Sequence, residues 1–248
     1  MSALAQSDAA TPRAGIGRRP GMTLYVALTS WMIVIVLAGF WPYFSRLAVG
    51  RPPSLHWLLH VHAAVFSGWM ILLAVQEGLA AAGRRARHMQ VGRIGVPYGA
   101  LLLVVGLVAS FVAPALHVSA GTWTRDQAAA FLVLPLGDML LFGGFFGAAI
   151  WHRRQPEIHK RLIILATVAL MFAPVARFLD STGSLPLMLV AWVSPVLIGM
   201  AHDLWRGGRV HGVYWLGLAL LVLAFVRVPL MDSELWLPVG RRLLGLVV

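Results

Sequence analysis

The sequence predicts an all-α, polytopic membrane protein, a bundle of seven transmembrane helices with its N-terminus on the inner side of the membrane. Of its 248 residues, 59% are hydrophobic and only 12% are charged, whereas soluble domains are about 25% charged. The apolar residues gather in seven long segments, and the basic residues gather between them. This composition excludes an ordinary soluble enzyme. The absence of cysteine also excludes disulfides and thiolate metal sites.

The chain divides into a tail, a transmembrane domain over 22–230 and a short extracytoplasmic tail over 231–248. Residues 1–21 bury too little apolar surface to fold, so we expect a disordered cytoplasmic tail there. Each apolar segment has about 17–24 residues, and about 20 cross a hydrocarbon core of ~30 Å. The runs are apolar on every side, which excludes the alternating strands of a barrel. The predicted spans are Thr23–Phe44, Val61–Ala82, Ile94–Leu116, Ala128–Trp151, Leu162–Leu179, Leu185–Ala201 and Val213–Leu230.

The loop cations predict the orientation, because short inner loops of membrane proteins are enriched in Arg and Lys. With the N-terminus inside, the inner segments hold Arg13, Arg18, Arg19, Arg84, Arg85, Arg87, Arg93, Arg153, Arg154, Lys160, Arg161, Arg206 and Arg209. The outer segments hold fewer cations, namely Arg46, Arg51, Arg125, Arg241 and Arg242. We therefore expect an N-inside, C-outside protein of a bacterial cytoplasmic membrane.

Topology also accounts for the net charge of +11. The sequence has no aromatic-interleaved basic surface that would follow a nucleic-acid backbone, so no nucleic acid is expected. The expected partner is the lipid bilayer. Membrane partner proteins or a homo-oligomer remain open.

The nine histidines are the main chemical signal, because imidazole binds transition metals and haem iron. The inner five are His88, His152, His159, His202 and His211, and the outer four are His56, His60, His62 and His117. We expect an inner-face haem or metal site built from His88, His159, His202 and His211, with Asp203 orienting one ligand. The alternative is that these histidines lie at the interface and bind no ligand.

Several known patterns are absent. No helix carries the widely spaced histidine pair of two-haem cytochromes, and neither H-x-x-H-H nor H-E-x-x-H occurs. His60 and His62 would point to different sides of a helix. The only lysine, Lys160, is not in the last span, which excludes a retinal Schiff base. The sequence has no G-x-S-x-G, P-loop or Rossmann motif.

Ionisable residues inside the predicted spans are functional candidates, because charges at depth are costly. Asp138 lies near the middle of the fourth span, Arg177 and Asp180 close the fifth, and Arg227 lies late in the seventh. We expect Asp138 to pair with Arg177 in preference to Arg227, because the fourth and fifth spans are consecutive. The alternative role is an ion pair that locks helix packing. Kinks are expected at Pro97, Pro114, Pro135, Pro174 and Pro195.

Three inner motifs and one outer motif look familiar. They are Arg87-His-Met-Gln-Val-Gly-Arg93, Pro156-Glu-Ile-His-Lys-Arg-Leu162, Asp203-Leu-Trp-Arg-Gly-Gly-Arg-Val-His211 and His60-Val-His62. Together they resemble an uncharacterised family of bacterial multi-pass membrane proteins, which implies the membrane fold but no particular activity. Single histidines near helix ends are also loosely similar to the cytochrome b561 class of transmembrane electron carriers. The histidines of this chain are not clearly matched across the membrane as that class requires.

Three functions follow as hypotheses. The first is a redox or metal- or haem-binding membrane protein with the histidine site on its inner face. The second is a small-molecule or proton-coupled transporter, with Asp138, Arg177 and Arg227 lining the path. The third is a structural or assembly partner without a site.

Overall fold

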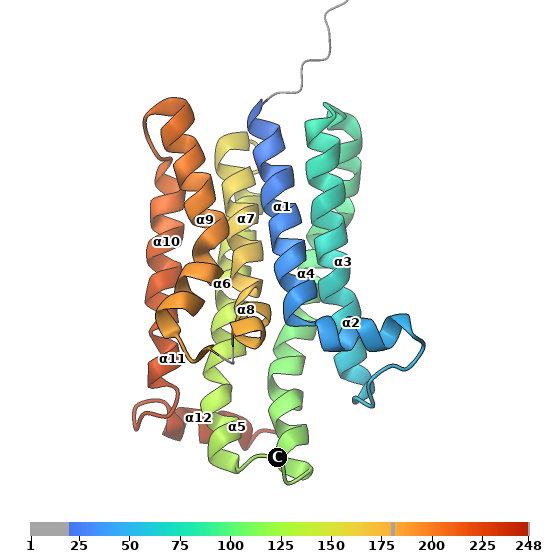
Figure 1. The fold of residues 1–248 in the computed structure, drawn as a ribbon, viewed down its shortest axis with the longest axis vertical. Coiled ribbons are helices and arrows are strands. Elements are labelled where there is room, and N and C mark those ends of the chain that lie inside the picture. Colours follow the sequence, from blue (N-terminus) through green and yellow to red (C-terminus); the bar gives the residue numbers. More distant parts are fainter. Residues whose placement is uncertain (1–19, 180–181, 248) are drawn as a thin grey trace, which may run out of the picture.

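The structure is a computed structural model that describes residues 20–179 and 182–247. Residues 1–19 of the predicted tail and Asp180 therefore lie outside the described residues. The described part contains helices and no strands, as the sequence predicts. Figure 1 shows an elongated bundle in which α1 begins at one end, here called the N-terminal end, and the C-terminus lies at the other.

The helices have the following bounds in chain order: α1 Pro20–Gly39, α2 Trp41–Ala48, α3 Trp57–Ala81, α4 Arg85–Ser119, α5 Arg125–Phe131, α6 Val133–Trp151, α7 Pro156–Leu170, α8 Phe172–Leu179, α9 Leu185–Gly207, α10 Gly212–Phe225, α11 Arg227–Leu230 and α12 Leu237–Leu244. Five are long and apolar enough to cross a membrane when α5 is joined to α6 and α10 to α11. The number rises to seven if α1 with α2, and α7 with α8, each form one bent span.

The first predicted span, Thr23–Phe44, is wrong at its end. The chain turns by 80° between α1 and α2, so Trp41–Ala48 forms a separate short helix across the bundle (Figure 1). Pro42 lies at the start of α2, where its missing N–H is tolerated, and Arg46 near its end is exposed. The straight first helix therefore ends at Gly39, five residues before the predicted end of the span at Phe44.

Several helices break just before a proline. The breaks at Leu132, Met171 and Val226 precede Pro135, Pro174 and Pro229, each by three residues. A proline lacks the N–H and its ring clashes with the carbonyl four residues earlier, so the preceding turn opens. Pro97, Pro114 and Pro195 lie inside continuous α-helices.

Two tryptophan side chains donate hydrogen bonds to α7 beside the break at Met171. The Trp192 indole donates to the Val168 carbonyl at 2.7 Å, and the Trp69 indole donates to the Thr167 hydroxyl at 3.2 Å. Both acceptors lie in the last turn of α7. Backbone polar groups at membrane depth need such partners inside the protein.

The core is centred on α7, which packs against α6, α9 and α10. Residues 161–170 of α7 are buried apart from the half-buried Ile163. A second small apolar cluster joins α5 to α12 at the C-terminal end, around Ala128, Leu132 and Leu244. These two clusters fix the central helices and the far end of the bundle.

The outer surface of the bundle is apolar. Leu140, Ile71 and Leu223 are among the exposed side chains along the helices. Exposed tryptophans mark both ends, with Trp151 and Trp205 at the ends of α6 and α9 and with Trp41 and Trp57 on the opposite side of the bundle. Lipid-facing apolar residues bordered by interfacial tryptophans are typical of membrane helices.

Helix α1 meets α8 through a glycine contact, which gives a stability prediction. A Cβ atom on Gly39 would lie 2.3–2.7 Å from main-chain atoms of Pro174. Gly39→Ala must separate the two helices, and overpacking of this kind costs about 1–3 kcal/mol. Thermal unfolding in detergent should show a lower Tm. Gly144→Ala is the matched control, because a Cβ at Gly144 meets nothing within 4 Å. Equal Tm values for both variants would contradict the contact.

Candidate functional site

A charged cleft opens at the N-terminal end of the bundle. It has a volume of about 510 Å³ and lies between α1, α7, α9 and the loop that leads into α10. Tyr25 lines it from α1, and Glu157, Lys160 and Arg161 line it from the first turns of α7. The opposite wall carries His202, Asp203, Arg206, Arg209 and His211.

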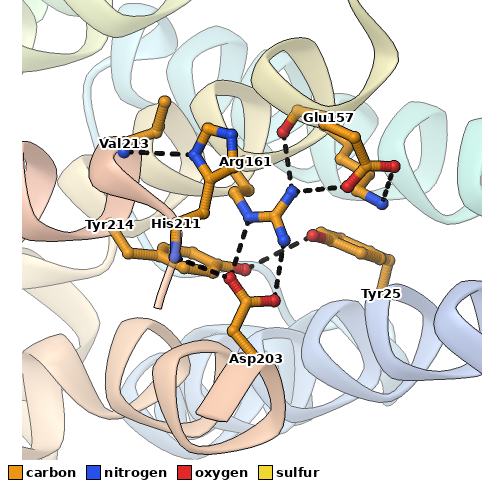
Figure 2. A network of polar contacts seen from close by, with 8 residues as sticks. Tyr25, Glu157, Arg161, Asp203, His211, Val213 and Tyr214 are labelled. Carbon is orange, nitrogen blue, oxygen red and sulfur yellow. Dashed lines mark hydrogen bonds and ion pairs between the residues drawn. The ribbon is translucent and has the colours of Figure 1, made fainter. Parts of the chain in front are cut away.

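Arg161 is the centre of the cleft wall (Figure 2). Its Nε and Nη2 atoms donate to the two carboxylate oxygens of Asp203 at 3.2 and 2.7 Å. Its Nη1 atom donates to the Glu157 carboxylate at 2.7 Å and to the Glu157 carbonyl at 2.8 Å. The Arg161 and Asp203 side chains are 7% and 10% exposed. This two-point ion pair therefore joins α7 rigidly to the end of α9.

Tyr25, which lines the cleft, contacts the buried Tyr214 behind it. The hydroxyls of Tyr25 and Tyr214 lie 3.5 Å apart, and the Arg161 guanidinium lies 5.3 Å from the Tyr214 ring centre. Lys160 lies 5.1 Å from the Tyr25 ring centre and donates to Glu157 at 2.7 Å. Cations over aromatic faces gain electrostatic stabilisation. These contacts link α1, α7 and α10 beside the cleft.

Asp203 has a different role from the one predicted. Besides Arg161 it accepts from the main-chain N–H of His211 at 3.2 Å, not from the imidazole. The His211 ring accepts from the Val213 N–H at 3.2 Å and caps α10 (Figure 2). The expectation that Asp203 orients a histidine ligand is therefore wrong in this structure. Asp203 instead positions Arg161 and the entry to α10.

The four histidines predicted as ligands do not form one cluster. His202 and His211 line the cleft, whereas His88 and His159 do not. The His159 Nδ1 atom lies 2.8 Å from the Ala149 carbonyl, and the His88 Nδ1 atom lies 3.3 Å from the Gln76 carbonyl. Within 20–179 and 182–247, no three His, Asp or Glu residues are grouped to hold a metal ion.

The remaining histidines have local partners. His152 bonds the Ala148 carbonyl, His56 caps α3, and His117 stacks on Trp123. His60 contacts the Tyr43 hydroxyl at 3.0 Å, while His62 packs on the Phe66 ring. These last two therefore have different partners, as their spacing predicts.

A second charged site lies inside the bundle, where Arg227 of α11 forms an ion pair with Asp138 of α6. The two side chains are 8% and 9% exposed. The predicted preference for Arg177 is wrong. Arg177 instead lies over the Phe40 ring and bonds the Ala173 carbonyl of its own helix. The break at Val226 starts α11 at Arg227 and so brings it beside α6.

The surroundings of Arg227 are aromatic and tightly packed. Its guanidinium lies 5.0 Å from the Phe172 ring centre and 5.6 Å from that of Trp192. A Cβ on Gly137 would lie 2.7 Å from the Arg227 Nη1 atom, so a larger residue there would have to displace the Arg227 side chain. The Nε and Nη1 atoms are buried without a hydrogen-bond partner among the described residues. The pair thus connects α6, α8, α9 and α11.

The two charged sites include residues that the sequence analysis does not single out. The sequence pattern places Arg161 among the loop cations, although it directly precedes the apolar run and stands four residues after Glu157, the spacing of a helical ion pair. Tyr25, Tyr214 and Trp192 carry no comparable local signal. Their positions depend on which helices are neighbours, which periodicity does not give.

The fold defines a multi-pass α-helical membrane protein, because several helices are long and apolar enough to cross a bilayer. Comparison with protein-family models, curated proteins and solved structures finds no match to this chain.

Proposed function

We propose that this chain spans the cytoplasmic membrane of a bacterium seven times, with its N-terminus inside, and transports a small polar solute. One observation supports this most strongly. The open cleft and the buried Asp138–Arg227 pair lie along the same helices. Segments α7–α8, α9 and α10–α11 each contribute to both.

Breaks in these helices favour movement along that line. Helices α7 and α10 are interrupted between the cleft and the ion pair, and Pro195 lies within α9. In transporters, discontinuous helices near the midplane hold charged groups and permit one half of the bundle to move against the other. The cleft is then the entry from the inner side, and the ion pair closes the outer half.

The transport proposal is tested in proteoliposomes of the purified protein. Uptake of radiolabelled phosphate, succinate or glycine is compared with uptake by protein-free vesicles. We expect uptake of at least one of these probes, reduced at least tenfold by Asp138→Asn. Failure of all three probes would favour a structural or assembly role without a transported solute.

The orientation gives a separate prediction. A reporter enzyme that is active only in the periplasm should be inactive when fused after Arg85, in the loop before α4. The same reporter fused after Gly121, between α4 and α5, should be active. The reverse pattern would overturn the N-inside topology, which rests on the loop cations.

A second candidate function is a haem- or metal-binding redox protein. One observation favours it, because His159 contacts a backbone carbonyl through Nδ1. An imidazole held in this way presents its Nε2 lone pair, the arrangement common in metal-ligating histidines. Haem iron needs only one or two such ligands. This proposal includes membership of the uncharacterised family of bacterial multi-pass membrane proteins that the sequence motifs resemble.

The optical spectrum of protein purified from haem-replete cells tests the second function. A haem protein should show a Soret band that His159→Ala or His88→Ala removes, since each removes one proposed ligand. His56→Ala should retain the band, because His56 caps α3 on the opposite side. A spectrum without a Soret band, together with no stoichiometric metal, would exclude this function.

A further inference from the structure

We propose that the cleft binds a phosphoryl group, held between the guanidinium groups of Arg206 and Arg209. This inference rests on the proposed function only in taking the cleft as the place where the solute is bound. The phosphoryl group belongs either to free phosphate or to the monoester headgroup of phosphatidic acid, an anionic phospholipid. The two sources share the same chemistry and are separated by experiment.

The first step of the argument is the charge of the cleft. Its carboxylates are already engaged, because Asp203 is bonded to Arg161 and Glu157 is bonded to Arg161 and Lys160. Arg206 and Arg209 line the same cleft and have no carboxylate partner among the described residues. Two positive charges therefore remain uncompensated at its rim.

Arg206 and Arg209 are three residues apart, at the end of α9 and just beyond it, and both line the cleft. Arg206 lies in the last turn of α9, and Arg209 follows Gly207 and Gly208. Gly208 adopts φ +66°, a left-handed conformation that ends the helix and reverses the chain. Helices α7 and α10 both begin at the cleft, and helix N-termini attract anions. Arg161 and these two arginines, which have no carboxylate partner among the described residues, therefore line one cleft.

The ligand class follows from this arrangement. A phosphoryl group carries close to two negative charges and three acceptor oxygens, so it can engage both guanidiniums and a third donor. Lys160, His202 and His211 line the cleft as candidates for that donor. A monocarboxylate would leave one guanidinium without a counter-charge.

The level of the cleft explains why a lipid headgroup shares this chemistry. Trp205 and Leu204, which adjoin the cleft on α9, are 81% and 57% exposed. Exposed tryptophans lie at the level of lipid headgroups. Basic pockets between membrane helices on the inner side bind anionic headgroups.

The experiment uses the full-length protein in phosphatidylcholine nanodiscs. Binding of radiolabelled inorganic phosphate is measured by equilibrium dialysis, with succinate as competitor. In a parallel arm, phosphatidic acid retained by the protein is counted by native mass spectrometry. We expect Arg206→Gln with Arg209→Gln to weaken whichever probe binds by at least tenfold.

The matched control is Arg153→Gln with Arg154→Gln, which removes the same charge from the neighbouring inner loop without touching the cleft. Binding of inorganic phosphate alone identifies a free solute, and retention of phosphatidic acid alone identifies a lipid. Equal losses of binding in both double variants, or no binding of either probe, would overturn the proposal. So would displacement of the labelled phosphate at a lower concentration of succinate than of unlabelled phosphate. Phosphate binding together with failure of all three uptake probes would retain the site and reject only the transport function.

Discussion

Asp138→Asn and Arg227→Gln should each destabilise the protein by about 3–5 kcal/mol, because each leaves the other side chain charged and unpaired inside the bundle. The double variant should lose much less than the sum, since it removes both charges together. Thermal or denaturant unfolding in detergent measures all four proteins of this cycle.

Arg177 provides the matched control for that cycle. Arg177→Gln removes a cation of the same kind, but its partners are the Phe40 ring and the Ala173 carbonyl, not Asp138. Its effect should therefore add to that of Asp138→Asn. Strong coupling of Asp138 to Arg177, with additive losses for Arg227, would show that a different pair forms in the membrane.

Arg161→Gln should have the second large effect, a loss of about 3 kcal/mol, because it strands the buried carboxylate of Asp203. The loss is nearer the lower limit for buried pairs because Glu157 is 63% exposed and remains solvated. The fall in Tm should be largely recovered by adding Asp203→Asn, which removes the stranded charge.

Arg154→Gln is the control for Arg161, since Arg154 is exposed beyond the end of α6. Exposed substitutions of this kind stay within about 0.5 kcal/mol. A similar Tm for Arg154→Gln and Arg161→Gln would show that the Asp203 pair contributes little to stability.

The sequence predicts the helical class well because lipid imposes a simple rule. Apolar segments of membrane length have few alternatives to helix, and each predicted span from Val61 onward lies on helices of the structure. The ends are less predictable, because helices continue beyond the apolar run. Thus α4 begins at Arg85, nine residues before the predicted Ile94.

The sites were only partly predictable from sequence. Depth identified Asp138 and Arg227 as unusual, but consecutive order favoured the wrong partner for Asp138. The correct pair depends on how α11 packs against α6, two elements far apart in the chain. The histidines, in turn, are visible in the sequence as candidate ligands, but the distances between their side chains are not. Residues with local partners, such as His152 and its Ala148 carbonyl, look the same in sequence as metal ligands.

The length of α4 has a consequence for how the bundle responds to ionic strength. Its 35 residues make a rod of about 52 Å, whereas the hydrocarbon layer is only ~30 Å thick. The α5–α12 corner lies at the C-terminal end of the bundle, beside the last turns of α4 (Figure 1). There the Nε and Nη2 atoms of Arg241 donate to the two carboxylate oxygens of Asp126 at 2.7 and 2.8 Å, and both side chains are more than half exposed. Salt screens the exposed Arg241–Asp126 ion pair much more than the buried Asp138–Arg227 pair. High ionic strength should therefore weaken the contact between α5 and α12 while the contact between α6 and α11 is kept.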